Sequence, residues 1–120
     1  MGKDLAKARR QAALFHSRKQ RRSREALAPH NSVGPVITGD FIEGEELSVS
    51  DGTWTGSPTF TYQWLRGPSL NKLVDIAGAD ADTYTLTADD VDLIVTCAVI
   101  ATNDFGVRSH KAAGAVVEAA

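Results

Sequence analysis

From Ser32 onward the chain is a succession of short runs rich in Val, Ile, Thr and Tyr, each bounded by Gly, Pro or Asp. Such runs are typical of β-strands separated by turns. They predict seven strands, at 34–38, 46–50, 60–66, 73–76, 83–87, 93–101 and 107–117. Strands so short and so closely spaced predict an all-β fold, an antiparallel sandwich in which two sheets enclose one core.

Alternation with a period of two identifies the residues that this sandwich would bury. One face of the strand 93–101 carries Leu93, Val95, Cys97, Val99 and Ala101. On the third predicted strand, Tyr62 and Trp64 share a face with Phe60. Because Trp64 lies in the middle of the third strand, we expect it at the centre of the core.

The other tryptophan and the cysteine are less central to the pattern. Trp54, in "DGTWTG", is expected to cover one end of the core, with partial exposure to a partner as the alternative. Cys97 is the single cysteine, so the chain cannot form an internal disulfide or a cysteine-rich zinc site. No basic residue lies near it in its strand, and we expect a buried, unreactive thiol.

Charge is divided unevenly along the chain. Residues 1–28 hold nine of the thirteen Lys and Arg against two acidic residues, a net charge of +7. The remaining residues hold four basic and thirteen acidic side chains, a net charge of −9. We call residues 1–28 the arm and residues 33–120 the body, joined by a predicted linker at 29–32.

The composition of the arm predicts a basic α-helix from about residue 4 to residue 26, ended by Pro29 and the polar residues after it. Four apolar residues recur on one face and most cations lie on roughly the opposite face. The apolar stripe is thin, so we expect the helix to become ordered when it docks on a partner. The residues expected to bind that partner are Lys3, Leu5, Lys7, Ala8, Arg10, Ala12, Phe15, Arg18, Arg21 and Arg22.

The sequence offers no recognisable catalytic or cofactor site. His16, His30 and His110 have no nucleophile and carboxylate at a familiar spacing, so an enzyme is not expected. The acidic residues near 43–46 and 80–92 match no calcium loop, and we interpret them as a solvated acidic rim without a metal. No apolar run is long enough to span a membrane, and no secretory signal begins the chain, unless a leader has already been removed.

Three blocks in succession carry a resemblance to a known family: "DGTWTGSPTFTYQWLRG", "IAGADADTYTLTADDVD" and "VIATNDFGV". Between Val33 and Val117 the chain resembles the immunoglobulin-like domains of bacterial surface proteins and tailed-phage virion proteins. The resemblance implies an immunoglobulin-like sandwich in which Trp64 is the core tryptophan and Tyr84 lies in the fifth strand. It also implies that "ATN" ends the sixth strand before its hairpin.

Family resemblance and arm together suggest a function. A single sandwich with a basic arm resembles a minor structural protein of a tailed-phage virion, assembled in the host cytoplasm. Its expected partners are major capsid, portal or connector, or tail subunits, and other copies of itself, with no cofactor and no membrane. Two alternatives stay open: a bacterial surface or adhesive module, and an accessory protein whose arm binds nucleic acid. Loops 67–71 and 78–82 are expected at the tips of the body.

Overall fold

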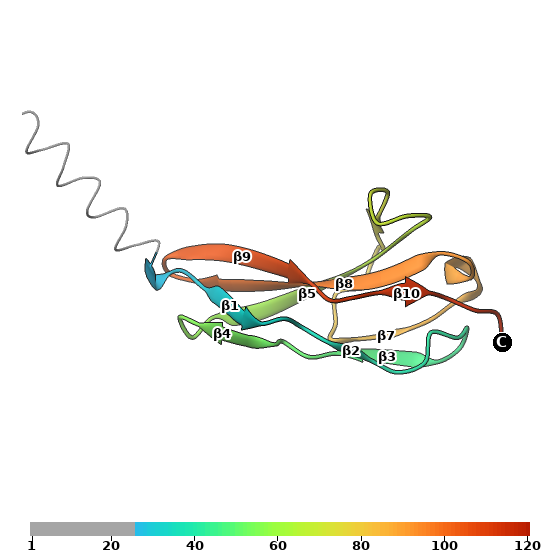
Figure 1. Cartoon of the computed structure of the whole chain (residues 1–120), viewed down its shortest axis with the longest axis horizontal. Coiled ribbons are helices and arrows are strands. Elements are labelled where there is room, and N and C mark those ends of the chain that lie inside the picture. Colours follow the sequence, from blue (N-terminus) through green and yellow to red (C-terminus); the bar gives the residue numbers. More distant parts are fainter. Residues whose placement is uncertain (1–25) are drawn as a thin grey trace, which may run out of the picture.

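The computed structural model describes residues 26–120, which form one elongated β-rich body (Figure 1). Residue 26 lies at one end of this body and the C-terminus at the other. The predicted helix and the ten arm residues expected to bind a partner lie outside the described residues. Among residues 26–120, no helix has the length and apolarity needed to cross a membrane.

The described residues are all-β, with ten strands and one short 3₁₀ helix. The strands are β1 (His30–Val33), β2 (Ile37–Thr38), β3 (Glu46–Val49), β4 (Thr53–Thr55), β5 (Thr59–Gly67), β6 (Val74–Asp75), β7 (Thr83–Thr85), β8 (Ile94–Asn103), β9 (Gly106–Lys111) and β10 (Ala115–Val116). The 3₁₀ helix η1 (Ala88–Asp90) precedes β8.

All strand pairs are antiparallel and form two larger sheets and a ribbon. One sheet has the order β2-β3-β7. The other has the order β10-β8-β5-β6, with β9 pairing β8 on the same side as β10 but nearer the end of β8. The ribbon joins β1 to β4. The two larger sheets face each other across a shared apolar core, so the body is sandwich-like.

The first and the last predicted strands differ most from the strands in the structure. The predicted strand 34–38 is reduced to β2, and the predicted strand 107–117 is divided into β9 and β10. The division coincides with Gly114, where an added Cβ would lie 2.2 Å from the carbonyl oxygen of Val95. The backbone therefore passes too close to β8 for a regular strand with side chains to continue.

Residues 29–32 belong to the body and do not form a linker. Pro29 is fully buried, and His30–Val33 forms β1, which pairs with β4 around Trp54. Neither strand was predicted, because β1 is polar and β4 is only three residues long. Each is stabilised mainly by the other, which is a tertiary contact.

Trp64 on β5 lies at the centre of the core and is completely buried. Its ring stacks on that of Tyr84 from β7, with the centroids 5.6 Å apart. Its indole N–H donates to the carbonyl of Ala81 at 2.7 Å, so the buried polar group is satisfied. Three residues of β8, namely Val95, Cys97 and Val99, are completely buried beside it, whereas Tyr62 and Tyr84 are half-buried against the core.

Trp54 is half-buried at the arm-proximal end of the body. Its ring centroid lies 6.2 Å from that of Phe60 in a tilted arrangement. The indole N–H donates to the carbonyl of Asp51 at 2.6 Å. Trp54 therefore covers the edge of the core and leaves part of its surface in solvent.

At the opposite end of the body, isolated β-bridges bring together three segments, around residues 42, 91 and 117–118. Parallel bridges join Ile42 to Glu118 and Val91 to Val117. These segments concentrate acidic residues, and none of the four cations of residues 29–120 lies in them. The acidic residues are Asp40, Glu43, Glu45, Glu46, Asp89, Asp92 and Glu118.

Replacing Trp64 with Ala is expected to lower the free energy of unfolding by about 3 to 5 kcal/mol, because it removes a completely buried aromatic side chain. Chemical denaturation of the full chain measures the change. Phe105→Ala is the matched control, since Phe105 is 48% exposed and its loss should change stability by no more than about 0.5 kcal/mol. Equal stability of the two variants would contradict the central role of Trp64.

Candidate interaction site at the arm-proximal end

The first described residues are fixed to the body by burial. Ala28 is 1% exposed and Pro29 is fully buried. An added Cβ on Gly106, the first residue of β9, would lie 3.3 Å from the Cβ of Ala28. The position at which the arm joins the body is therefore determined by packing against the β8–β9 hairpin.

Asn103, the last residue of β8, links three segments at this junction through its side-chain amide. Its Nδ2 donates to the carbonyl of Leu27 at 2.9 Å and to that of Gly56 at 3.0 Å. Its Oδ1 accepts from the backbone N–H of Phe105 at 2.8 Å. One side chain thus joins the end of the arm, the β4–β5 turn and the β8–β9 turn.

The β4–β5 turn is shaped for this contact by Gly56. Its φ is +90°, a conformation that residues with side chains rarely adopt. An added Cβ would also lie 2.8 Å from the Nδ2 of Asn103. Glycine is required here both for the turn and for the close approach of the amide.

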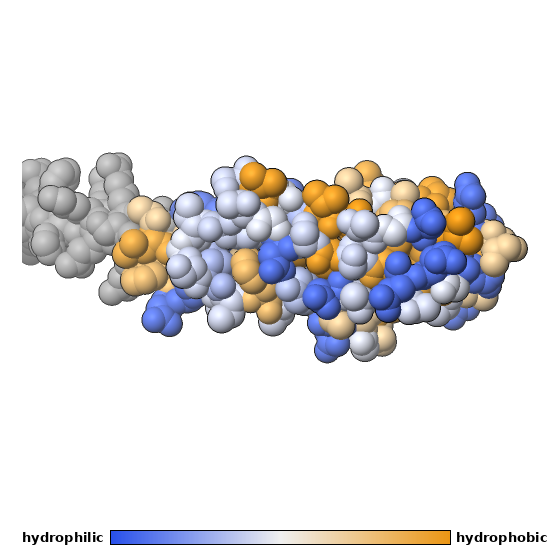
Figure 2. Space-filling model, turned by 90° about the horizontal axis from the view of Figure 1, so that it is seen from below, coloured by the Kyte–Doolittle hydropathy of each residue, from blue (hydrophilic) through white to orange (hydrophobic). Residues whose placement is uncertain are grey.

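Exposed apolar side chains surround the junction. Leu27 is 51% exposed, and Phe105 and Val107 in the adjoining hairpin are 48% and 56% exposed. Phe105 also lines a shallow hollow of about 400 Å³ between the two turns, from Gly56 to Thr59 and from Thr102 to Phe105. Apolar residues are visible at this end of the body in Figure 2. Clusters of this kind occur where proteins contact other proteins.

The junction could not be found from the sequence alone. The "ATN" segment was expected only to end a strand, and nothing local indicates that Asn103 reaches residues 27 and 56. The one available signal was the combination of glycines near 56 and 106 with an Asn, residues that favour tight turns.

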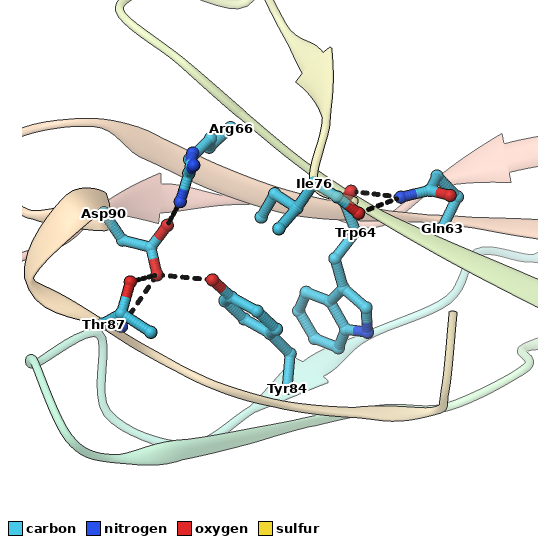
Figure 3. Close-up of polar contacts among 7 residues, drawn as sticks. All are labelled: Gln63, Trp64, Arg66, Ile76, Tyr84, Thr87 and Asp90. Carbon is cyan, nitrogen blue, oxygen red and sulfur yellow. Dashed lines mark hydrogen bonds and ion pairs between the residues drawn. The ribbon is translucent and has the colours of Figure 1, made fainter. Parts of the chain in front are cut away.

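One acidic residue of the predicted solvated rim is in fact completely buried. Asp90, at the end of η1, is 0% exposed. Its Oδ1 accepts from Arg66 at 2.9 Å, and its Oδ2 accepts from the Tyr84 hydroxyl at 2.7 Å and the Thr87 N–H at 2.8 Å (Figure 3). The prediction was wrong for Asp90, because its charged partner Arg66 lies on β5, 24 residues away in the sequence.

This network sets the ionisation of its members. Burial by itself would raise the pKa of Asp90, but the hydrogen bonds from Thr87, Arg66 and Tyr84 outweigh it and lower the pKa. Burial and the bond to Asp90 raise the pKa of Tyr84 to about 12. The network joins the two sheets and is structural, because none of its buried polar atoms lacks a hydrogen-bond partner.

Cys97 lies in an apolar setting that suppresses its reactivity. Burial raises the pKa of its thiol to about 12, so almost no thiolate forms at neutral pH. Among residues 26–120, no three His, Cys, Asp or Glu side chains are grouped so that they could hold a metal ion.

The two predicted tip loops lie elsewhere than expected. The loop 67–71 stands out from the side of the body, between its two ends (Figure 1). The segment 78–82 crosses between the sheets and is bound to the core, since the backbone N–H of Trp64 donates to the carbonyl of Ala79 at 2.9 Å. Gln63 fixes the start of this crossing by donating to the carbonyl of Ile76 at 2.9 Å (Figure 3).

Comparison with known proteins adds no relative: no protein-family model, no curated protein and no solved structure matches this chain.

Asn103→Ala is expected to destabilise the junction by about 2 kcal/mol, because three backbone groups lose their side-chain partner. Amide exchange at residues 27–29 and 56–59 should accelerate while exchange at the centre of β8 changes less. Asn71→Ala, in the exposed β5–β6 loop, is the control. Unchanged exchange at residues 27–29 would show that the amide does not hold the junction.

Asp90→Ala is expected to lower the free energy of unfolding by about 3 kcal/mol at neutral pH, because it leaves Arg66 without its partner. Asp89→Ala, at an exposed neighbouring position, is the control.

The lowered pKa of Asp90 predicts the pH dependence of this difference. A carboxylate whose pKa is lower in the folded state stabilises the fold above its unfolded pKa of about 3.9. The contribution is lost as the pH falls through the folded pKa. The stability difference between the wild type and Asp90→Ala should therefore be full at pH 6 and shrink below about pH 4. A difference independent of pH would contradict an ionised Asp90.

Proposed function

We propose that this chain is a non-enzymatic structural protein of a tailed-phage virion, on which the arm anchors the body as an outward projection. The observation that carries the proposal is the separation of charge. The arm has a net charge of +7 and joins the body at one end, whereas the acidic residues of the body concentrate at the other. Such a molecule can bind an acidic surface through one end while its other end is repelled from that surface.

The order of the strands supports an immunoglobulin-like sandwich. The order β2-β3-β7 in one sheet, opposite β9-β8-β5-β6 in the other, follows an immunoglobulin-type arrangement in which the third long strand carries the core tryptophan. Trp64 occupies that position on β5, where it packs beside Cys97 of β8 in the core. Leu47 of β3, in the opposite sheet, belongs to the same core.

The junction supports the anchoring role. Ala28 and Pro29 are buried, and the Asn103 amide holds Leu27, so the body cannot swing freely about the end of the arm. A partner that contacts residues 27–29 and the adjoining turns would therefore also set the direction in which the body projects. Leu27, Phe105 and Val107 lie beside the junction and would add apolar contact with the same partner. Capsid, portal or tail subunits are the partners proposed.

The test is whether full-length variants are incorporated into particles of the phage whose genome carries this gene. Wild type should be a stoichiometric component of purified particles. Replacing Leu5 and Phe15 with Glu should abolish incorporation, because the apolar face of the predicted helix could no longer dock. Leu70→Glu is the control, since Leu70 lies at an exposed loop far from the arm. Absence of the wild-type protein from particles would overturn the proposal.

Measuring binding to random-sequence duplex DNA across a salt series tests the alternative function, in which the arm binds nucleic acid. The net charge of the arm is the feature that favours this alternative. An arm that pairs with phosphates gives an affinity that falls steeply with salt, by about 0.9 logarithmic units per phosphate contact for each tenfold rise in salt concentration. In that case, replacing Arg18, Arg21 and Arg22 with Gln weakens DNA binding, whereas the uncharged replacements Leu5→Ser and Phe15→Ser do not.

A further inference from the structure

β9 is an open edge of the larger sheet. It runs for six residues, Gly106–Lys111, and pairs with β8 on one side only. No strand among residues 26–120 pairs with its other side, and β9 follows the outline of the body in Figure 1. Among the residues that the structure describes, only exposed side chains contact the backbone along this edge, since Arg108 donates to the carbonyl of Val107 and the His110 ring lies 3.0 Å from the carbonyl of Lys111. An added strand can displace such side chains and pair with the backbone groups of the edge.

The charge of β9 is opposite to that of the body around it. Residues 29–120 contain only four cations, and two of them, Arg108 and Lys111, lie on β9. A third, Arg66, is already paired with the buried Asp90. The open edge is therefore the most basic strip on a body whose net charge is −9.

β7 is an open edge of the opposite sheet and has the complementary charge. It pairs with β3 on one side, and no described strand covers the other. Asp80 and Asp82 precede it and are exposed, as are the side chains of Thr83 and Thr85. A shallow hollow of about 260 Å³, lined by residues between Ala77 and Thr85, lies beside this edge and leaves it accessible.

We propose that the β9 edge of one copy pairs with the β7 edge of a second copy, with Arg108 and Lys111 lying against Asp80 and Asp82. The contact is a backbone ladder whose partner choice is set by charge. Because the two edges are different surfaces, the contact is head-to-tail and propagates into a ring or a filament. β7 has only three residues, so the contact is weak and needs a high local concentration. The proposal does not depend on the arm or on a virion.

The same cations have a second physical explanation, which the test must separate. Lys and Arg on an edge strand commonly prevent edge-to-edge association. If Arg108 and Lys111 only protect the edge, neutralising them increases self-association. If they select the β7 edge, neutralising them decreases it, so the two explanations differ in the sign of the effect.

The experiment measures self-association of the full-length chain by sedimentation over a range of concentrations at low salt. Wild type should associate, and the double replacement Arg108→Glu with Lys111→Glu should weaken association by about tenfold or more. Asp80→Lys with Asp82→Lys should do the same, and the chain carrying all four replacements should recover association. Lys72→Glu, at an exposed loop cation, is the control and should associate as wild type does. Thermal unfolding checks that each variant is folded.

Three results would overturn the proposal. The first is a wild type that remains monomeric at the highest concentration reached. The second is stronger association after Arg108→Ser with Lys111→Ser, which identifies the cations as protection of the edge. The third is association that is lost with the Asp80 and Asp82 replacements, unaffected by the Arg108 and Lys111 replacements and not recovered by all four, which means that the arm lies on the next body.

Discussion

The pairing of β5 with β8 is the interaction on which the rest of the structure depends. The two strands are in register over nine residue pairs, from Thr59 opposite Thr102 to Gly67 opposite Ile94. Toward one end of this ladder, Trp64 stacks on Tyr84 of the opposite sheet and Arg66 pairs with the buried carboxylate of Asp90 in η1. At the other end, β8 finishes in Asn103, which holds the end of the arm. The core and the junction are thus two ends of one rigid element.

The polar groups of the body divide into two kinds according to their surroundings. Asp90 accepts hydrogen bonds from Arg66, Tyr84 and Thr87, and its charge helps to hold the two sheets together. The other acidic residues of the C-terminal end are partly or fully exposed, and their charge acts over distance. An acidic body with a basic arm and one basic edge has three surfaces that prefer different partners. This arrangement favours a role in assembly, in agreement with the proposed virion function.

Much of the fold could be predicted because burial follows local alternation. The β8 residues at every second position are buried, and Trp64 lies between the sheets, as the period of two requires. The ribbon of β1 and β4 could not be predicted, since neither strand has a pattern of its own and each depends on the other. The candidate site was predicted only in its arm, whose ten expected binding residues lie outside the described residues. Its described part, the Asn103 contacts, joins residues 76 and 47 positions apart in the chain.

The sequence by itself determined the all-β class, the central tryptophan, the buried thiol and the separation of charge, because each of these depends on composition or on short-range periodicity. Only the tertiary structure decided which acidic residue is buried, where the arm is held, and which strands are left as open edges. These properties depend on side chains and backbones that meet across the sandwich, and the free energy of such contacts has no local signature in the chain.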